Sequence, residues 1–169
     1  IPHIAFDLQA SAIAVSWIPV AMLWGNVVFL LPIGRLADIV GRKRMFVTGI
    51  LLFILSSLCV LLPQSISSLL IIRVVQGISS SMVYGTSMAI IGVVYANSNR
   101  GQALGIAASS VYLGLTLGPL IGGWLTQHLG WQSVFWAPTG ILVLCLVVLF
   151  VYVKGDWQSS IRVKFDWQG

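Results

Sequence analysis

The sequence contains no glutamate, and it has only four aspartates and two cysteines among its 169 residues. Charged residues make up 8% of the chain, whereas a soluble domain carries about 25%. Hydrophobic residues make up 58%, and the mean hydropathy is +0.99. Because so few polar side chains cannot cover a water-facing surface, a soluble globular domain is excluded. We expect lipid to contact much of the chain.

Catalytic and metal-binding groups are also scarce. Cys59 and Cys145 lie inside apolar runs with no histidine or cysteine nearby, which excludes a disulfide framework and a zinc site and favours small apolar packing residues. The sequence shows no Ser-His-Asp set, no cluster of metal ligands and no glycine-rich phosphate loop following a strand. We therefore expect no enzyme activity, no metal and no cofactor.

Long apolar runs dominate what remains, and each is long enough to cross a bilayer, which takes about 20 residues. Backbone groups in lipid must be satisfied within the segment, so helices are expected. The fold class predicted is all-α and integral to the membrane, with one transmembrane helix bundle over residues 1–153 and a cytoplasmic loop over 154–169. The five expected spans are about 12–33, 45–62, 66–95, 102–125 and 134–153.

The nine Lys and Arg residues give a net charge of +5, a balance that can indicate nucleic-acid binding. Here the basic residues instead concentrate in short loops, at 34–44, 96–101 and 154–169, and none lies in the loops at 63–68 or 127–133. The positive-inside rule makes the basic loops cytoplasmic. We therefore expect a multi-pass protein of the plasma membrane that contacts the lipid bilayer and no nucleic acid.

Two segments resemble each other and lie on opposite sides of the predicted membrane. Gly34–Phe46 and Gly123–Phe135 share four residues at matching positions. Opposite placement is what an inverted repeat requires. The matching pairs are Gly34 with Gly123, Leu36 with Leu125, Gly41 with Gly130, and Phe46 with Phe135.

The first chemical pattern is Gly34-x-Leu-Ala-Asp38-x-x-Gly41-Arg42-Lys43. It can be explained as a tight turn with charges that orient the helices. That explanation gives Asp38 no role. A carboxylate four residues before Arg42 can accept hydrogen bonds from the cations or from a helix N-terminus. Such a cluster is a candidate latch that stabilises one conformation of the bundle.

The second pattern, Arg73-x-x-Gln76-Gly77, lies inside the third predicted span. A charged residue inside a membrane is costly unless it is paired or hydrated. Arg73 lies about 10 Å from the start of its helix, so its side chain can either snorkel to the surface or face a polar cavity. We favour the cavity, with Arg73, Gln76 and Gly77 in a proton or substrate path.

The third pattern is Gly114-x-x-x-Gly118-Pro119-x-x-Gly122-Gly123 in the fourth predicted span. Glycines spaced by four residues form a smooth ridge that another helix can approach closely. Pro119 removes a backbone hydrogen bond and bends the helix. Plain helix packing is the simpler explanation, but the glycine–proline combination is more specific than small-residue spacing alone.

Taken together, the three patterns resemble the major facilitator superfamily over essentially the whole chain. The first resembles the family's signature loop between its second and third spans and departs from it at Ile39, where a basic residue is usual. The resemblance implies that Asp38 and Arg42 help to hold the outward-open state. The second pattern resembles a proposed proton-transfer element of the fourth span, and the third resembles the fifth-span motif of antiporters.

Aligned in this way, the five expected helices are the second to sixth spans of a partial N-terminal six-helix half. The chain begins at Ile1 and looks like an internal piece of a longer protein, with Ile1-Pro2 as the tail of the first span. Residues 165–169 resemble the segment that leads into the seventh span of fourteen-span drug:proton antiporters, which we favour over twelve-span exporters.

The resemblance implies a multidrug exporter that exchanges small amphipathic compounds for protons by alternating access, completed by the missing C-terminal half. A solute:proton symporter of the same fold is the first alternative, and a non-transporting membrane sensor or scaffold is the second. No aspartate lies clearly within an expected span, because Asp7 precedes the first, Asp38 lies in a loop, and Asp156 and Asp166 lie in the tail. The proton-coupling carboxylate is therefore not identified.

Overall fold

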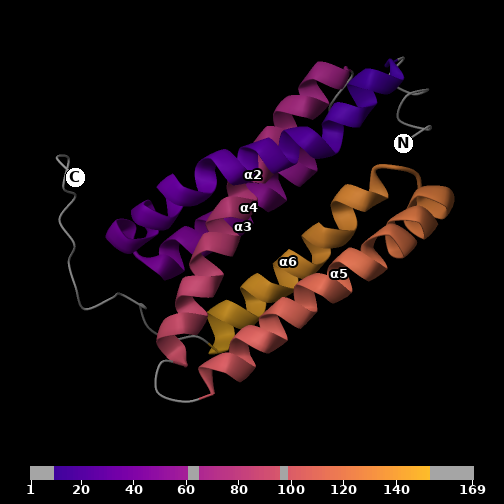
Figure 1. Ribbon diagram of the computed structural model, residues 1–169. Coiled ribbons are helices and arrows are strands. Elements are labelled where there is room, and N and C mark those ends of the chain that lie inside the picture. Colours follow the sequence, from indigo (N-terminus) through magenta and orange to yellow (C-terminus); the bar gives the residue numbers. More distant parts are fainter. Residues whose placement is uncertain (1–9, 61–64, 96–98, 153–169) are drawn as a thin grey trace.

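The structure is a computed structural model that describes residues 10–60, 65–95 and 99–152. Over these residues the chain forms α-helices and no strand, which confirms the predicted fold class (Figure 1). The expected tail at 154–169, the end of a first span at Ile1-Pro2 and three of the four aspartates lie outside the described residues. The helices are α2 (Ala12–Val40), α3 (Arg42–Cys59), α4 (Ile66–Val94), α5 (Arg100–Leu129) and α6 (Ser133–Tyr152).

Four of these helices, α2, α4, α5 and α6, are long and apolar enough to cross a membrane. The sequence predicted five such spans. Helix α3 does not qualify over its 18 described residues, because its first turn is the basic run Arg42-Lys43-Arg44. The apolar part of α3 alone is therefore shorter than the thickness of the hydrocarbon core.

The helices form two groups (Figure 1). Helix α4 packs along α2 over the most extensive of the helix–helix contacts and along α3 over the next. Helices α5 and α6 form an antiparallel pair beside this group, and α6 touches α3 while α5 touches α4 only slightly. No residue of α5 is buried within the described chain.

The helix boundaries differ from the expected spans where the chain leaves the membrane. The expected connection at 34–44 is mostly helical, because α2 remains helical to Val40 and α3 begins at Arg42. Only Gly41 interrupts the helices, with φ +106°, a conformation that favours glycine. Asp38 therefore lies on the last turn of α2 and not in a loop. Hydrophobicity marks where the membrane ends, whereas a polar helix can continue into water.

The second half of the internal repeat shows the same geometry. Gly130, which aligns with Gly41, follows α5 with φ +82°, and these are the two glycines with positive φ in the described ranges. The expected fourth loop at 127–133 shrinks accordingly to residues 130–132, between α5 and α6. Arg100, expected in a cytoplasmic loop, is the first residue of α5. The matching helix ends support the repeat that the sequence suggested.

The closest helix crossing joins α2 and α4 at two glycines. A Cβ atom added to Gly25 would lie 2.5 Å from the carbonyl oxygen of Val74, and one added to Gly77 would collide with the Met22 carbonyl. Because these are backbone atoms, neither neighbour can rotate away. Glycine at both positions lets the two backbones touch, as small residues do in membrane helix pairs.

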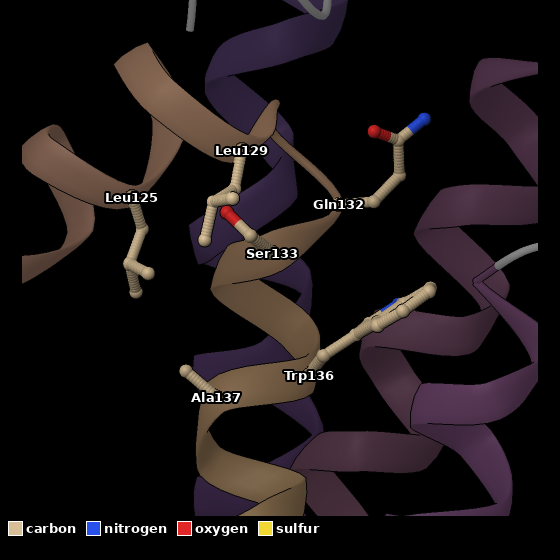
Figure 2. A pocket seen from close by; sticks show the side chains of 6 residues that line it. All are labelled: Leu125, Leu129, Gln132, Ser133, Trp136 and Ala137. Carbon is tan, nitrogen blue, oxygen red and sulfur yellow. The ribbon is translucent and has the colours of Figure 1, made fainter.

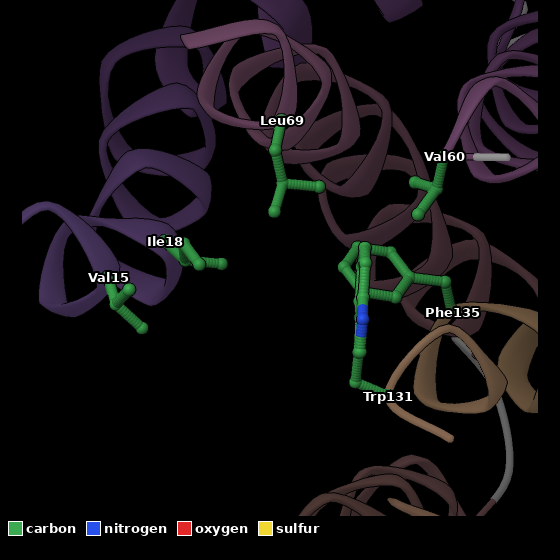
Figure 3. Packing of buried hydrophobic residues seen from close by; sticks show 6 residues of the cluster. All are labelled: Val15, Ile18, Val60, Leu69, Trp131 and Phe135. Carbon is green, nitrogen blue, oxygen red and sulfur yellow. The ribbon is translucent and has the colours of Figure 1, made fainter. Parts of the chain in front are cut away.

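A hydrophobic cluster ties one end of the bundle together. It joins the start of α2 and α4, the end of α3 and the start of α6 (Figure 3). Trp131 and Phe135 contribute the aromatic side, and their rings meet edge to face with centroids 5.9 Å apart. The remaining members of the cluster are Val15, Ile18, Val60 and Leu69. This cluster fixes the position of α6 beside the residues described next.

Candidate functional site

Arg73 lies two turns into α4, at the end of the bundle that holds this cluster. Its Nη1 donates a hydrogen bond to Oε1 of Gln76 over 3.2 Å and contacts Sδ of Met22 at 3.7 Å. Its Nε is buried and has no hydrogen-bond partner in the described part of the chain. A buried guanidinium that is only partly bonded is costly in a membrane and points to a functional constraint.

Gln76 is held in one orientation by the neighbouring helix. Its Nε2 donates to Oγ of Ser57 on α3 over 2.9 Å, and both side chains are buried. Because the amide nitrogen faces Ser57, the amide oxygen must face Arg73. The chain Ser57–Gln76–Arg73 therefore links α3 to α4 and fixes the side of α4 on which the guanidinium lies.

Phe135 of α6 covers the guanidinium from the other side. The Cζ atom of Arg73 lies 4.1 Å from the centre of the Phe135 ring. Such a cation–π contact contributes about 0.5–2 kcal/mol, depending on how far the cation is desolvated. It supports Arg73 but does not neutralise its charge.

A cavity of about 620 Å³ lies against Arg73. One wall comes from α2, through Val15, Ile18 and Pro19. Another comes from Trp131 in the turn between α5 and α6 and from Phe135 in the first turn of α6. The wall contributed by α5 consists of Gly118, Pro119, Gly122, Gly123, Thr126 and Gln127. Two patterns that are far apart in the sequence thus share one cavity of the size that suits a small organic ligand.

The glycine ridge of α5 is open. A Cβ atom added at Gly114, Gly118, Gly122 or Gly123 would meet nothing within 4 Å. No described helix therefore approaches the ridge closely, and the close approach stays a prediction about a helix outside this chain. Within the chain, the small residues of α5 leave space beside Arg73.

A second cavity of about 630 Å³ adjoins the turn between α5 and α6. It is lined by Leu125 and Leu129 of α5, by Ser133 and Ala137 of α6, and by Gln132 and Trp136 (Figure 2). Figure 2 shows Gln132 and Trp136 projecting to the same side. Because none of its lining residues is charged, this cavity offers no group for proton transfer.

The candidate latch forms at the opposite end of the bundle. Oδ1 of Asp38 accepts hydrogen bonds from Nε and Nη2 of Arg42 over 3.0 and 2.8 Å. Nη1 of Arg42 donates to the carbonyl oxygen of Ala89 on α4 over 3.1 Å. The pair is partly exposed, so the ion pair alone contributes only about 0.2–1 kcal/mol. Its effect is therefore to hold the α2–α3 turn on α4.

The sequence patterns identified the charged residues and the glycines of the Arg73 cavity and of the Asp38–Arg42 latch. The structure shows which residues contact them. Arg73 and Gln76 do contact each other, whereas Gly77 faces α2 at the helix crossing and not the cavity. A Cβ atom added to Gly34 would meet nothing within 4 Å. The residues that sequence reasoning missed are Gly25, Ser57, Ala89 and Phe135, of which only Phe135 carried a signal, as a matching position of the repeat.

The sequence also resembles known proteins over nearly its whole length. The sequence model of the Major Facilitator Superfamily matches residues 1–164. Multidrug resistance protein Stp of Mycobacterium tuberculosis (strain CDC 1551 / Oshkosh) is 32% identical over 100% of this chain and 32% of its own length. The tetracenomycin C resistance and export protein of Streptomyces glaucescens is 33% identical over 99% of this chain and 31% of its own length.

A third relative, the riboflavin transporter RibZ of Clostridioides difficile (strain 630), is 29% identical over 89% of this chain and 33% of its own length. The chain thus spans about a third of the length of the curated relatives it matches.

Proposed function

This chain belongs to the major facilitator superfamily, and from that premise we propose that it is the N-terminal part of an exporter that exchanges small amphipathic compounds for protons. The family consists of transporters, and the chain is a multi-pass plasma-membrane protein like its relatives. The relatives named for multidrug resistance and export support the outward direction of transport. The fourteen-span type rests on the sequence of residues 165–169, which lie outside the described ranges.

The observation that carries the proposal is the shared cavity of Arg73 and the glycine–proline string of α5. In alternating access, two bundles rock around a central site, and the missing C-terminal half covers the open face of α5. A wall of glycines lets that half move closely past α5, and Arg73 supplies a cation in the proton or substrate path. The contacts of Arg73 and of the α5 glycines would change as the cavity opens and closes.

The latch acts at the cytoplasmic end. Arg42 uses three of its nitrogens to bind Asp38 and Ala89, so the carboxylate is held at the end of α2. Oδ2 of Asp38 has no hydrogen-bond partner among the described residues, and it is available to the missing half. A charge-assisted hydrogen bond contributes about 1.5–3 kcal/mol, which shifts a two-state equilibrium by roughly ten- to a hundredfold. Asp38 would thereby favour the outward-open state.

The test uses the full-length protein in inverted membrane vesicles with an acidic interior. A panel of amphipathic compounds is added while a fluorescent dye reports the pH gradient, for the wild type, for Asp38→Asn and for Arg35→Gln as a control. Arg35 is exposed on the same helix and makes no hydrogen bond or ion pair within the described residues. Dissipation by compounds in the wild type and the control, but not in Asp38→Asn, supports the antiporter and its latch.

Other outcomes separate the alternatives. In vesicles that are preloaded with a solute, proton efflux that carries the solute out of the lumen identifies a symporter of the same fold. If Arg73→Ala and Asp38→Asn have no effect and no compound moves protons in the wild type, the protein is a non-transporting sensor or scaffold.

A further inference from the structure

We infer that Phe135 is a positioning residue for Arg73, and that Trp131 in the turn between α5 and α6 holds the Phe135 ring in place. The inference rests on the proposed export function, because it names the residues that orient Arg73 in the proposed transport path. It follows from the contacts of the guanidinium, from the packing of the two rings and from the matching turns of the internal repeat.

The first step is the way in which the guanidinium of Arg73 is held. Its Nη1 donates to Oε1 of Gln76 over 3.2 Å, and its Cζ lies over the Phe135 ring, 4.1 Å from the ring centre. A hydrogen bond at one nitrogen leaves a planar group able to turn about that bond, whereas an aromatic ring against its flat face opposes the turning. Gln76 thus fixes where the group lies, and Phe135 fixes the direction in which its plane faces.

The second step is the packing of the Phe135 ring. Phe135 is 3% exposed, and the edge-to-face contact with Trp131 closes one side of it. Figure 3 shows the two rings meeting within the cluster that also contains Val60 and Leu69. Buried side chains in such a cluster keep a single rotamer, because their neighbours fill the surrounding space. Removal of the Trp131 ring would leave a gap into which the Phe135 ring could turn, away from Arg73.

The third step is the origin of the two partners in different helices. Arg73 belongs to α4 and Phe135 to α6, and both line the cavity whose other wall is the glycine–proline string of α5. A movement of α6 along α4 would carry the ring off the guanidinium, and the turn at 130–132 would pass the same movement to α5. The position of the α5–α6 pair therefore determines the orientation of Arg73.

The internal repeat provides an independent argument for Trp131. Trp131 aligns with Arg42, and each of them follows a glycine with positive φ. Arg42 fastens its turn to α4 by donating to the carbonyl oxygen of Ala89 over 3.1 Å, whereas Trp131 packs its turn into the cluster that includes Leu69 of α4. The same position of the repeat thus fixes a turn on α4 in both copies, once through a cation and once through a ring.

The first test weakens the contact without changing the shape of the ring. Trifluorophenylalanine at position 135 of the full-length protein removes most of the negative charge from the ring face, and para-fluorophenylalanine removes part of it. The rate at which inverted vesicles take up ethidium and rhodamine 6G measures transport. A cation–π contact shifts an equilibrium by roughly two- to thirtyfold. We expect the trifluoro variant to be slower by a factor in this range and the monofluoro variant to lie between it and the wild type.

The matched control carries trifluorophenylalanine in place of Phe150, which lies on the same helix and is 63% exposed. This variant should transport both dyes at the wild-type rate. The inference is overturned if the trifluoro ring at position 135 leaves the rate unchanged, or if the same ring at position 150 slows transport equally.

The second test detects the contact without transport. The fluorine NMR resonance of para-fluorophenylalanine at position 135 is recorded for the full-length protein in lipid nanodiscs. Arg73→Gln should shift the resonance because it removes the cation, and Trp131→Leu should shift or broaden it because the ring gains freedom. Arg100→Gln, which removes a cation at the other end of α5, should leave it unchanged. A resonance that is the same in the wild type and in Arg73→Gln contradicts the positioning of Arg73 by this ring.

The two proposals fail separately. If the resonance responds to Arg73→Gln and the wild type transports neither dye, the export function loses its support and the contact of Phe135 with Arg73 stands. If the wild type transports the dyes and the trifluoro variant does so equally fast, the export function stands and the inference is wrong.

Discussion

The crossing of α2 and α4 gives the sharpest test of the packing. In Gly77→Ala, the new Cβ would collide with the Met22 carbonyl and lie 2.9 Å from N of Asn26 and 3.0 Å from Cα of Gly25. These are backbone atoms, so the helices themselves must separate. Overpacking costs up to about 3 kcal/mol, and the better helix propensity of alanine returns about 1. The expected net loss of stability is about 2 kcal/mol.

Gly85→Ala is the matched control on the same helix. Its Cβ would meet only Cδ1 of Leu30 at 3.9 Å, an ordinary contact, so the variant should be as stable as the wild type or up to about 1 kcal/mol more stable. Unfolding of the full-length protein in detergent, followed by size-exclusion fluorescence over a range of temperatures, measures the difference. If the two variants unfold at the same temperature, the close crossing at Gly77 is wrong.

Three further predictions concern other residues. Gly41→Ala places a side chain at φ +106° and should destabilise the protein by about 1–3 kcal/mol. Gly101→Ala is the control, because its Cβ would meet no atoms within 4 Å. If Gly41→Ala destabilises the protein no more than Gly101→Ala does, the turn at Gly41 is not strained by a side chain. Ser57→Ala leaves Nε2 of Gln76 buried without its partner and should cost about 1–3 kcal/mol in thermal unfolding, and an unchanged melting temperature would show that the amide has another partner. Gly118→Leu should fill part of the cavity and slow export several-fold without changing the melting temperature, so unchanged turnover in vesicles would mean that this wall does not contact the substrate.

The sequence predicts the helices well because each is a long apolar run, and in lipid such a run has no alternative structure. It predicts their ends poorly. The segment 34–40 is polar enough to look like a loop, yet every residue in it can continue a helix, and only the positive φ of Gly41 ends it. Polarity reports the surrounding solvent, whereas backbone conformation decides where a helix stops.

The candidate site also contains residues that the sequence predicts and residues that it does not. Arg73 stands out in the sequence because a charge in an apolar run is costly, and Gln76 follows from helical spacing. Ser57 and Phe135 could not be paired with them, because both come from other helices and their positions depend on the angles at which the helices pack. Gly25 was missed for the same reason, because its role in the helix crossing can be recognised only once Gly77 is known to face it.

The absence of any buried residue in α5 within the described chain has a consequence for biosynthesis. Chains emerge from the ribosome N-terminus first, at about 5–20 residues per second. Helices α2, α3 and α4 can associate as soon as α4 is inserted, whereas α5 enters the bilayer before the helices that would cover its glycine ridge have been made. For seconds to tens of seconds, this face is shielded by lipid alone. The nascent protein would thus hold this face of α5 open to other membrane helices, and to any insertion factor that protects it, until later helices cover it.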